Sequence, residues 1–71
     1  MEYSKRTFPH ILKELRETEG LTQSELRTEI DVPQSTISKY ENGQLEADYK
    51  TLIKLADFFN VTIDYLLGRE K

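Results

Sequence analysis

Cysteine and tryptophan are absent from this 71-residue sequence, and histidine occurs only once. Without cysteine the chain forms no disulfide and no thiolate metal site. The single histidine, His10, would need carboxylates as every other ligand in order to hold zinc, and the sequence offers no such cluster. We therefore expect no metal and no cofactor.

Long apolar runs are also missing. No segment approaches the roughly 20 apolar residues that a membrane-spanning helix needs. Near the N-terminus charged residues interrupt the apolar ones, so a signal peptide is not expected either. These absences predict a cytoplasmic protein without membrane contact.

The sequence has fewer basic than acidic residues: ten Lys and Arg against thirteen Asp and Glu give a net charge of −3. Nucleic-acid-binding proteins are usually basic, so such a function has to be argued from where residues lie rather than from their sum. Catalytic signatures are missing as well, since there is no glycine-rich phosphate loop and no paired-carboxylate site. We therefore expect that this protein is not an enzyme.

What the sequence does contain is a helical period. Apolar residues at the spacing of one helix face predict a first helix over about 7–18, and Gly20 follows its end. Pro9 is tolerated in the first turn, where a missing N–H costs little. The residues of this apolar stripe are Phe8, Ile11, Leu12 and Leu15.

Four more helices are expected downstream. Thr22 and Glu25 have the spacing of a capping box, which predicts the start of a second helix that breaks at Asp31. A third helix over about 34–41 begins after Pro33 and ends at Asn42-Gly43. A fourth helix is capped by Asp48 and ends at Asn60, and a fifth is capped by Thr62 and ends at Gly68. No segment alternates with period two, so the sequence predicts an all-α, compact five-helix domain over 7–68, with tails at 1–6 and 69–71.

The third helix has two unlike faces. On a helical wheel Ile37 and Tyr40 fall together and are expected to be buried. Polar residues lie opposite, and glutamine, lysine and serine side chains are suited to base edges in the major groove of DNA. A polar face is equally typical of any surface helix. The helix is nevertheless too short to be stable by itself, so it is held by its two apolar residues while its N-terminal half projects, as in a groove-reading helix.

At this point a family resemblance becomes specific. The segment LTQSELRTEIDVPQSTISKYENGQ resembles the helix-turn-helix of the lambda repressor and Cro family, also called the Xre family. The segment TLIKLADFFNVTIDYLLG is similar to that family's fourth and fifth helices, and with LKELRETEG upstream the match covers about Phe8 to Gly68. The resemblance implies a helix-turn-helix over about 22–41. It also implies sequence-specific binding of double-stranded DNA by a transcriptional regulator of the repressor kind, in the nucleoid of a prokaryotic or phage-infected cell.

The resemblance assigns roles by position. Base-reading positions are matched by Gln34, Ser35 and Lys39. Contacts to the DNA backbone are implied for Thr22, Gln23 and Asn42, with Gln23 binding phosphate at the start of the second helix. Thr36 and Ser38 lie beside the base-reading positions; we assign them to the backbone, with contact to a base as the alternative. Arg16 and Glu41 match a structural pair that bridges the first helix to the end of the recognition helix.

For several of these residues a purely structural interpretation stays open. Thr22 is a helix cap whatever the function. The alternative role for Asn42 is to end the third helix in the left-handed conformation. Alternatively, Arg16 and Glu41 form an exposed ion pair that contributes little to stability.

Three residues depart from the family pattern. Arg27 stands where alanine is usual, so either its stem extends outward with the charge in water or the second and third helices splay slightly. Asp31 takes a turn position that glycine usually holds in the left-handed region. Pro33 replaces the usual Ser or Thr cap. The loop at 44–48 is acidic where several phage repressors are basic, which predicts weak non-specific binding and a shallow salt dependence.

One short helix with few cationic contacts covers too little DNA for discrimination, so we expect a homodimer on a palindromic operator, with half-sites about 10 base pairs apart. The expected interface residues are Phe58, Ile63, Tyr65 and Leu67. Alternatively, Ile63 and Leu67 complete the core and the other two are scattered surface residues. The rival function is a protein-interaction module, an antitoxin or anti-regulator on the same fold, which the negative net charge favours.

Overall fold

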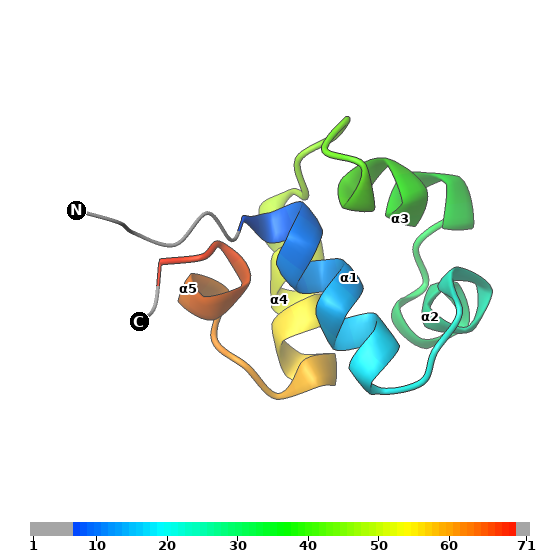
Figure 1. The fold of residues 1–71 in the computed structure, drawn as a ribbon, viewed down its shortest axis with the longest axis horizontal. Helices are drawn as coiled ribbons and strands as arrows, with labels where there is room; N and C mark the ends of the chain where they lie inside the picture. The colour runs from blue at the N-terminus through cyan, green and yellow to red at the C-terminus, as the bar shows by residue number, and fades with distance from the viewer. Residues whose placement is uncertain (1–6, 70–71) are drawn as a thin grey trace.

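Five α-helices make up the part of the chain that the structure, a computed structural model, describes, residues 7–69 (Figure 1). They are α1 (Phe8–Thr18), α2 (Gln23–Ile30), α3 (Gln34–Glu41), α4 (Tyr49–Phe59) and α5 (Ile63–Leu66). No strand occurs in this range, so the predicted all-α class is confirmed. A membrane-spanning helix is not found among these five. Of the expected tails at 1–6 and 69–71, residues 1–6 and 70–71 lie outside the described residues, whereas Arg69 is described and exposed.

Side-chain caps begin three of the helices, as the sequence predicts. The side chains of Thr22, Asp48 and Thr62 each accept a hydrogen bond from the backbone N–H three residues on, at 3.0, 2.9 and 3.0 Å. Thr22 also donates its backbone N–H to the Glu25 carboxylate at 2.8 Å, which completes the capping box. These caps satisfy backbone groups that the first turn of a helix leaves without partners.

Left-handed residues end the helices. Asp31 and Asn60 have φ values of 58° and 57°, and Gly43 has 77°. Asn42 lies in the right-handed region at φ −92°, so the interpretation of Asn42 as a left-handed stop is wrong. Gly43 takes that conformation instead, because only glycine adopts it without steric cost from a Cβ.

The other two departures from the family pattern, Arg27 and Pro33, leave the helices in place. Arg27 is exposed, so its charge stays in water while α2 and α3 remain packed together. Pro33 sits at the N-cap of α3 and makes no side-chain cap, as expected. Its carbonyl accepts hydrogen bonds from the backbone N–H groups of Thr36 and Ile37, at 3.0 Å each.

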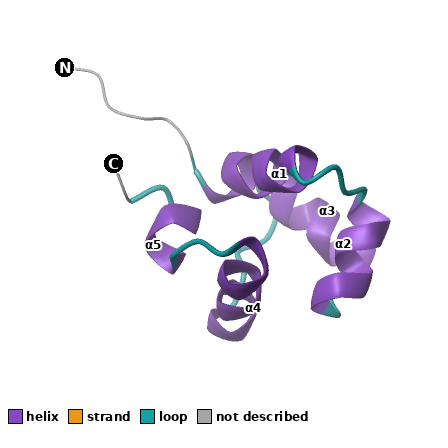
Figure 2. Ribbon diagram, turned by 90° about the horizontal axis from the view of Figure 1, so that it is seen from below, coloured by secondary structure: helices purple, strands orange, loops and turns teal. Residues whose placement is uncertain are grey.

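One core holds the helices together. Helix α1 packs against α3 and α5, while α2 packs against α3 and α4. As a result α5 lies at the opposite end of the molecule from α2 and α3 (Figures 1 and 2). This arrangement leaves the outer sides of α2 and α3 free of any covering helix. The buried apolar residues are Ile11, Leu12, Leu26, Ile30, Val32, Ile37, Tyr40, Leu52, Leu55, Ala56 and Leu66.

Candidate nucleic-acid interface

Helix α3 is fastened to the core by two side chains. Ile37 is completely buried and Tyr40 is 4% exposed. The ring of Phe8 meets that of Tyr40 edge to face, with ring centroids 5.7 Å apart. Such an aromatic contact adds to the stabilisation from apolar burial. The short helix is therefore held firmly from one side.

The opposite side of α3 is polar and open. Gln34, Ser35 and Lys39, the three predicted base-reading residues, are all exposed. Thr36 and Ser38 are half-buried between the two sides. Asn42, just past the helix, is exposed, and its side-chain amide donates a hydrogen bond to the Ser38 hydroxyl at 3.4 Å. The structure thus places hydrogen-bonding groups along one outward edge of the molecule.

The N-terminus of α2 adds backbone donors beside this edge. The capping box uses the N–H groups of Thr22 and Glu25, so those of Gln23 and Ser24 are left without a partner within the helix. Free N–H groups together with the helix dipole favour an anion such as phosphate. The Glu25 carboxylate in the same turn opposes that preference in part.

An ion pair joins α1 to the end of α3. Arg16 donates to both carboxylate oxygens of Glu41, from Nε to Oε2 at 2.7 Å and from Nη2 to Oε1 at 3.0 Å. The side chains are only 11% and 4% exposed, so the alternative of an exposed pair does not hold. Hydrogen bonding to Glu41 raises the pKa of Arg16 above its usual value, against the opposing effect of desolvation. The remaining guanidinium nitrogen, Nη1, donates to the Leu21 carbonyl at 2.7 Å.

Gln23 is the third member of this cluster. Its side-chain Nε2 donates a hydrogen bond to Glu41 Oε1 at 3.1 Å, and the residue is half-buried. The Glu41 carboxylate therefore accepts from α1 and from the first residue of α2, while belonging itself to the last turn of α3. All three helices meet at one carboxylate.

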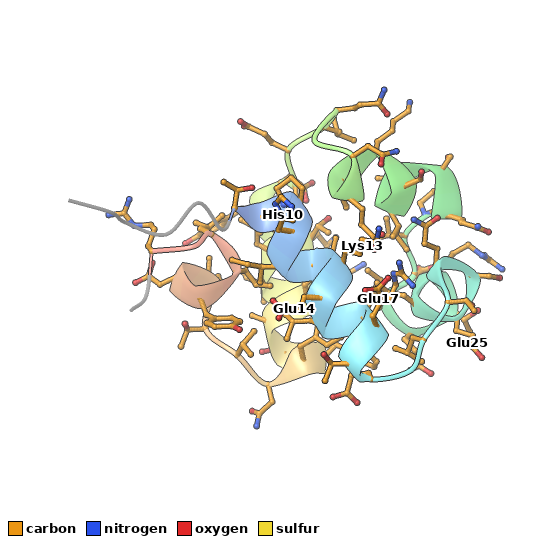
Figure 3. All side chains as sticks on the ribbon, in the orientation of Figure 1. His10, Lys13, Glu14, Glu17 and Glu25 are labelled. Carbon is orange, nitrogen blue, oxygen red and sulfur yellow. The ribbon has the colours of Figure 1, made fainter. Side chains whose placement is uncertain are left out.

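Charged side chains on α1 flank the same side of the molecule. Figure 3 shows Lys13 on the side of α1 that faces α3, with His10 one turn earlier. Both line a shallow hollow together with Asn42 and Gly43. Glu14 and Glu17 lie next to them along α1, so this flank carries both signs of charge. No group of three or more potential metal ligands occurs among the described residues.

Comparison with known proteins assigns the arrangement to a family. A helix-turn-helix family model matches residues 12–66, which is most of the chain. The chain belongs to the helix-turn-helix family. Its two defining helices are α2 and α3, joined by the turn at 31–33.

Relatives and solved structures agree with this membership. The HTH-type transcriptional regulator ImmR of Bacillus subtilis (strain 168) is 38% identical over 60 residues, which cover 84% of this chain and 47% of ImmR. A transcriptional regulator from Listeria innocua superposes with a TM-score of 0.83 at 29% identity, covering 92% of this chain and 61% of that one. The chain spans about half the length of the curated relatives it matches.

A repressor of known structure shows the same fold. The P22 c2 repressor, solved in complex with a synthetic operator, superposes with a TM-score of 0.86 over 93% of this chain and 100% of that chain, at 21% identity. At that identity the likeness concerns the fold alone. The compact five-helix fold of lambda-repressor-like domains is therefore the fold of this helix-turn-helix protein.

The four residues expected at a dimer interface lie in different places on this helix-turn-helix fold. Phe58 is 37% exposed and lines a hollow beside α2 with Ile30 and Lys54. Leu67 is 41% exposed and lines a different hollow, with Phe8 and Leu45 near the start of α1. Ile63 and Tyr65 are half-buried and pack against the core. The structure does not gather these four side chains into one hollow.

Sequence reasoning on the helix-turn-helix also missed the bond between Gln23 and Glu41. A helical wheel compares residues within one helix, whereas this bond joins residues 18 positions apart in two helices. The only available signal was that both residues were singled out by the family resemblance, in separate roles. Their contact depends on how α2 and α3 pack.

Proposed function

We propose that the chain binds double-stranded DNA sequence-specifically, with α3 in the major groove, and acts as a transcriptional regulator. The observation that carries this proposal is the two-sidedness of α3, where Ile37 and Tyr40 are buried while Gln34, Ser35 and Lys39 are exposed. A groove-reading helix needs this combination of a firm attachment and a free hydrogen-bonding edge. The relatives named as transcriptional regulators support it.

The backbone of DNA would be held beside that edge. Gln23 and the N-terminus of α2 are suited to one phosphate, and Thr22 and Asn42 to its neighbours. Thr36 and Ser38 flank the base-reading residues and contact the backbone in this proposal. Such contacts fix the position of α3 along the groove without reading the sequence.

Repression is the simplest regulatory outcome, because it requires only that an operator be occupied. The proposed regulator carries out no catalysis and works in the cytoplasm, where the nucleoid of a prokaryotic or phage-infected cell is found. Two copies would bind a palindromic operator, since a single α3 reads few base pairs.

Selection from a random DNA pool tests the proposal, followed by mobility shift with the selected duplex at two salt concentrations. We expect an enriched motif with two-fold symmetry and tighter binding to it than to a scrambled duplex. If no motif is enriched and binding is equal for both duplexes, sequence-specific recognition is wrong.

The net charge of −3 favours a second candidate, a protein-interaction module such as an antitoxin or anti-regulator. This function predicts no DNA binding at low salt, where electrostatic attraction to phosphate is strongest. The same mobility-shift series therefore separates the two functions.

A further inference from the structure

The Glu41 carboxylate accepts one more hydrogen bond than its pairing with Arg16 provides. Its side chain is 4% exposed, and it accepts two hydrogen bonds from Arg16 and a third from Gln23. The third bond reaches the one side chain in the cluster that belongs to the proposed DNA-contacting surface. Glu41 is thus a member of the ion pair inside the fold and also contacts a residue of the proposed DNA-contacting surface.

We propose that Glu41 is a positioning residue for DNA binding: with its charge neutralised by Arg16, it orients the Gln23 amide toward a DNA phosphate. The inference rests on the proposed DNA-binding function and adds a residue that does not itself touch DNA. Gln23 remains the residue that makes the contact.

The chemistry of a primary amide supports this role. The Gln23 Nε2 carries two protons, and one of them is donated to Glu41 Oε1 at 3.1 Å. The second proton is left for an acceptor on the outer side of the half-buried side chain. A glutamine side chain has several freely rotating bonds, and fixing them before the ligand arrives removes an entropic cost of binding.

The Arg16 guanidinium makes this arrangement compatible with an anion. A lone carboxylate beside Gln23 would repel phosphate, and in a shielded site that repulsion would be strong. Two charge-assisted hydrogen bonds from Arg16 make the pair neutral overall. Arg16 is in turn held by the Leu21 carbonyl at 2.7 Å, so the geometry is fixed on both sides.

A purely structural role for the pair predicts something different. In that case losing Glu41 would change folding stability, and the effect of Gln23 on DNA affinity would be the same with or without it. Positioning predicts that the contribution of Gln23 depends on Glu41. The two roles are therefore separated by the coupling between these residues in DNA affinity.

The test measures affinity for the selected duplex by fluorescence anisotropy, using the full chain. The four proteins are wild type, Gln23→Ala, the double variant Arg16→Met/Glu41→Met, and the triple variant. Replacing a buried ion pair by apolar residues of similar size often leaves stability nearly unchanged, and urea denaturation checks that here. Asn42→Ala, made in both backgrounds, is the control for a backbone contact outside the cluster.

We expect Gln23→Ala to weaken binding by about tenfold in the wild-type background, as for one hydrogen bond to a charged group. In the double-variant background it should weaken binding by less than about twofold, whereas Asn42→Ala should have equal effects in both. An equal effect of Gln23→Ala in both backgrounds overturns the proposal. If Gln23→Ala does not weaken binding in the wild-type background, the proposal is also overturned, although DNA binding by the chain is not. If wild type binds no selected duplex, the proposed function fails rather than this inference.

A measurement on the free wild-type protein does not depend on how any variant folds. Nitrogen-15 relaxation of the side-chain amides compares Gln23 with the exposed Gln44. We expect the Gln23 amide to be clearly more restrained on the ps–ns timescale. If its mobility equals that of Gln44, Glu41 does not position it.

Discussion

Three exposed side chains on α3 carry the proposed base readout: Gln34, Ser35 and Lys39. Replacing any one of them by alanine should relax specificity at one base pair of each half-site. The expected loss is about 1–3 kcal/mol for the preferred base, because a good side-chain contact to a base edge contributes that much. Repeating the selection with each variant measures the change. If all three variants select the wild-type operator, the assignment is wrong.

Residues assigned to the DNA backbone provide the contrast for that experiment. Substitution of Asn42 should weaken binding to all sequences nearly equally and leave the selected motif unchanged. Thr22 needs a stability measurement alongside, because loss of its cap costs about 1 kcal/mol by itself. A variant with altered base preference at unchanged overall affinity would contradict the backbone role.

Asp31 offers a prediction about stability at a single residue. Its φ of 58° is in the left-handed region, at the C-terminus of α2, where a negative charge also opposes the helix dipole. We expect Asp31→Gly to raise the free energy of unfolding by about 0.5–1 kcal/mol, since glycine removes both penalties despite its greater entropy when unfolded. Urea denaturation measures this. Asp31→Asn removes only the charge and should give a smaller gain; a destabilised glycine variant would count against the explanation.

At the scale of elements, the Arg16–Glu41 pair is the polar link between α1 and α3. Because both side chains are nearly buried, a double-mutant cycle in urea should give a coupling energy above the roughly 0–1 kcal/mol of exposed pairs. Removing one partner should destabilise more than removing both, since it leaves a shielded charge alone. A coupling energy near zero would show that the pair adds nothing to stability.

The start of α4 depends on the ionisation of Asp48. Hydrogen bonds from Thr51, from its side chain and then from its backbone N–H, lower the pKa of Asp48 below its ordinary value. A carboxylate with a lowered pKa in the folded state stabilises the protein above the unfolded-state pKa of about 3.9, and this stabilisation is lost as the pH falls through the folded-state pKa. The variant Asp48→Asn keeps a capping side chain that does not titrate.

The measurement for Asp48 is the free energy of unfolding of wild type and Asp48→Asn as a function of pH. Their difference should be constant above about pH 5, and the wild-type advantage should shrink as the pH falls below about 4. A difference that stays constant down to pH 2 would mean that the ionised cap makes no contribution. Lys13→Ala, at an exposed position on α1, serves as a control for general changes in charge.

For the whole molecule, the prediction concerns assembly on DNA. Sedimentation with and without the selected duplex should show two chains per duplex, and the selected motif should have half-sites about 10 base pairs apart. The salt dependence of binding should be shallow, since the polar edge of α3 includes a single lysine and the following loop is acidic. A one-to-one complex on a site without two-fold symmetry would exclude the dimer.

The surface that joins two copies is less defined than the surface that meets DNA. Phe58 and Leu67 line separate hollows, one beside α2 and the other near the start of α1. Introduced charges therefore serve as a probe: Phe58→Lys and Leu67→Lys should differ in their effect on two-chain complexes if only one hollow lies at the interface. Folding of each variant is checked by urea denaturation.

Local sequence preferences specify the five helices and their ends. Caps at Thr22, Asp48 and Thr62, and the breaks at Asp31 and Asn60, depend on side chains and φ preferences within three or four residues. The burial of Ile37 and Tyr40 follows from helical spacing, again a local property. For this reason the five helices and the two faces of α3 were predictable from the residues alone.

Contacts between side chains of different helices, in contrast, follow from how the helices pack. The shielding of Arg16 with Glu41, the bond from Gln23 to the same carboxylate, and the separation of Phe58 from Leu67 all depend on how the helices cross. The physical reason is that hydrogen bonds act over about 3 Å, and the relative placement of two helices is set by the whole core, not by either segment.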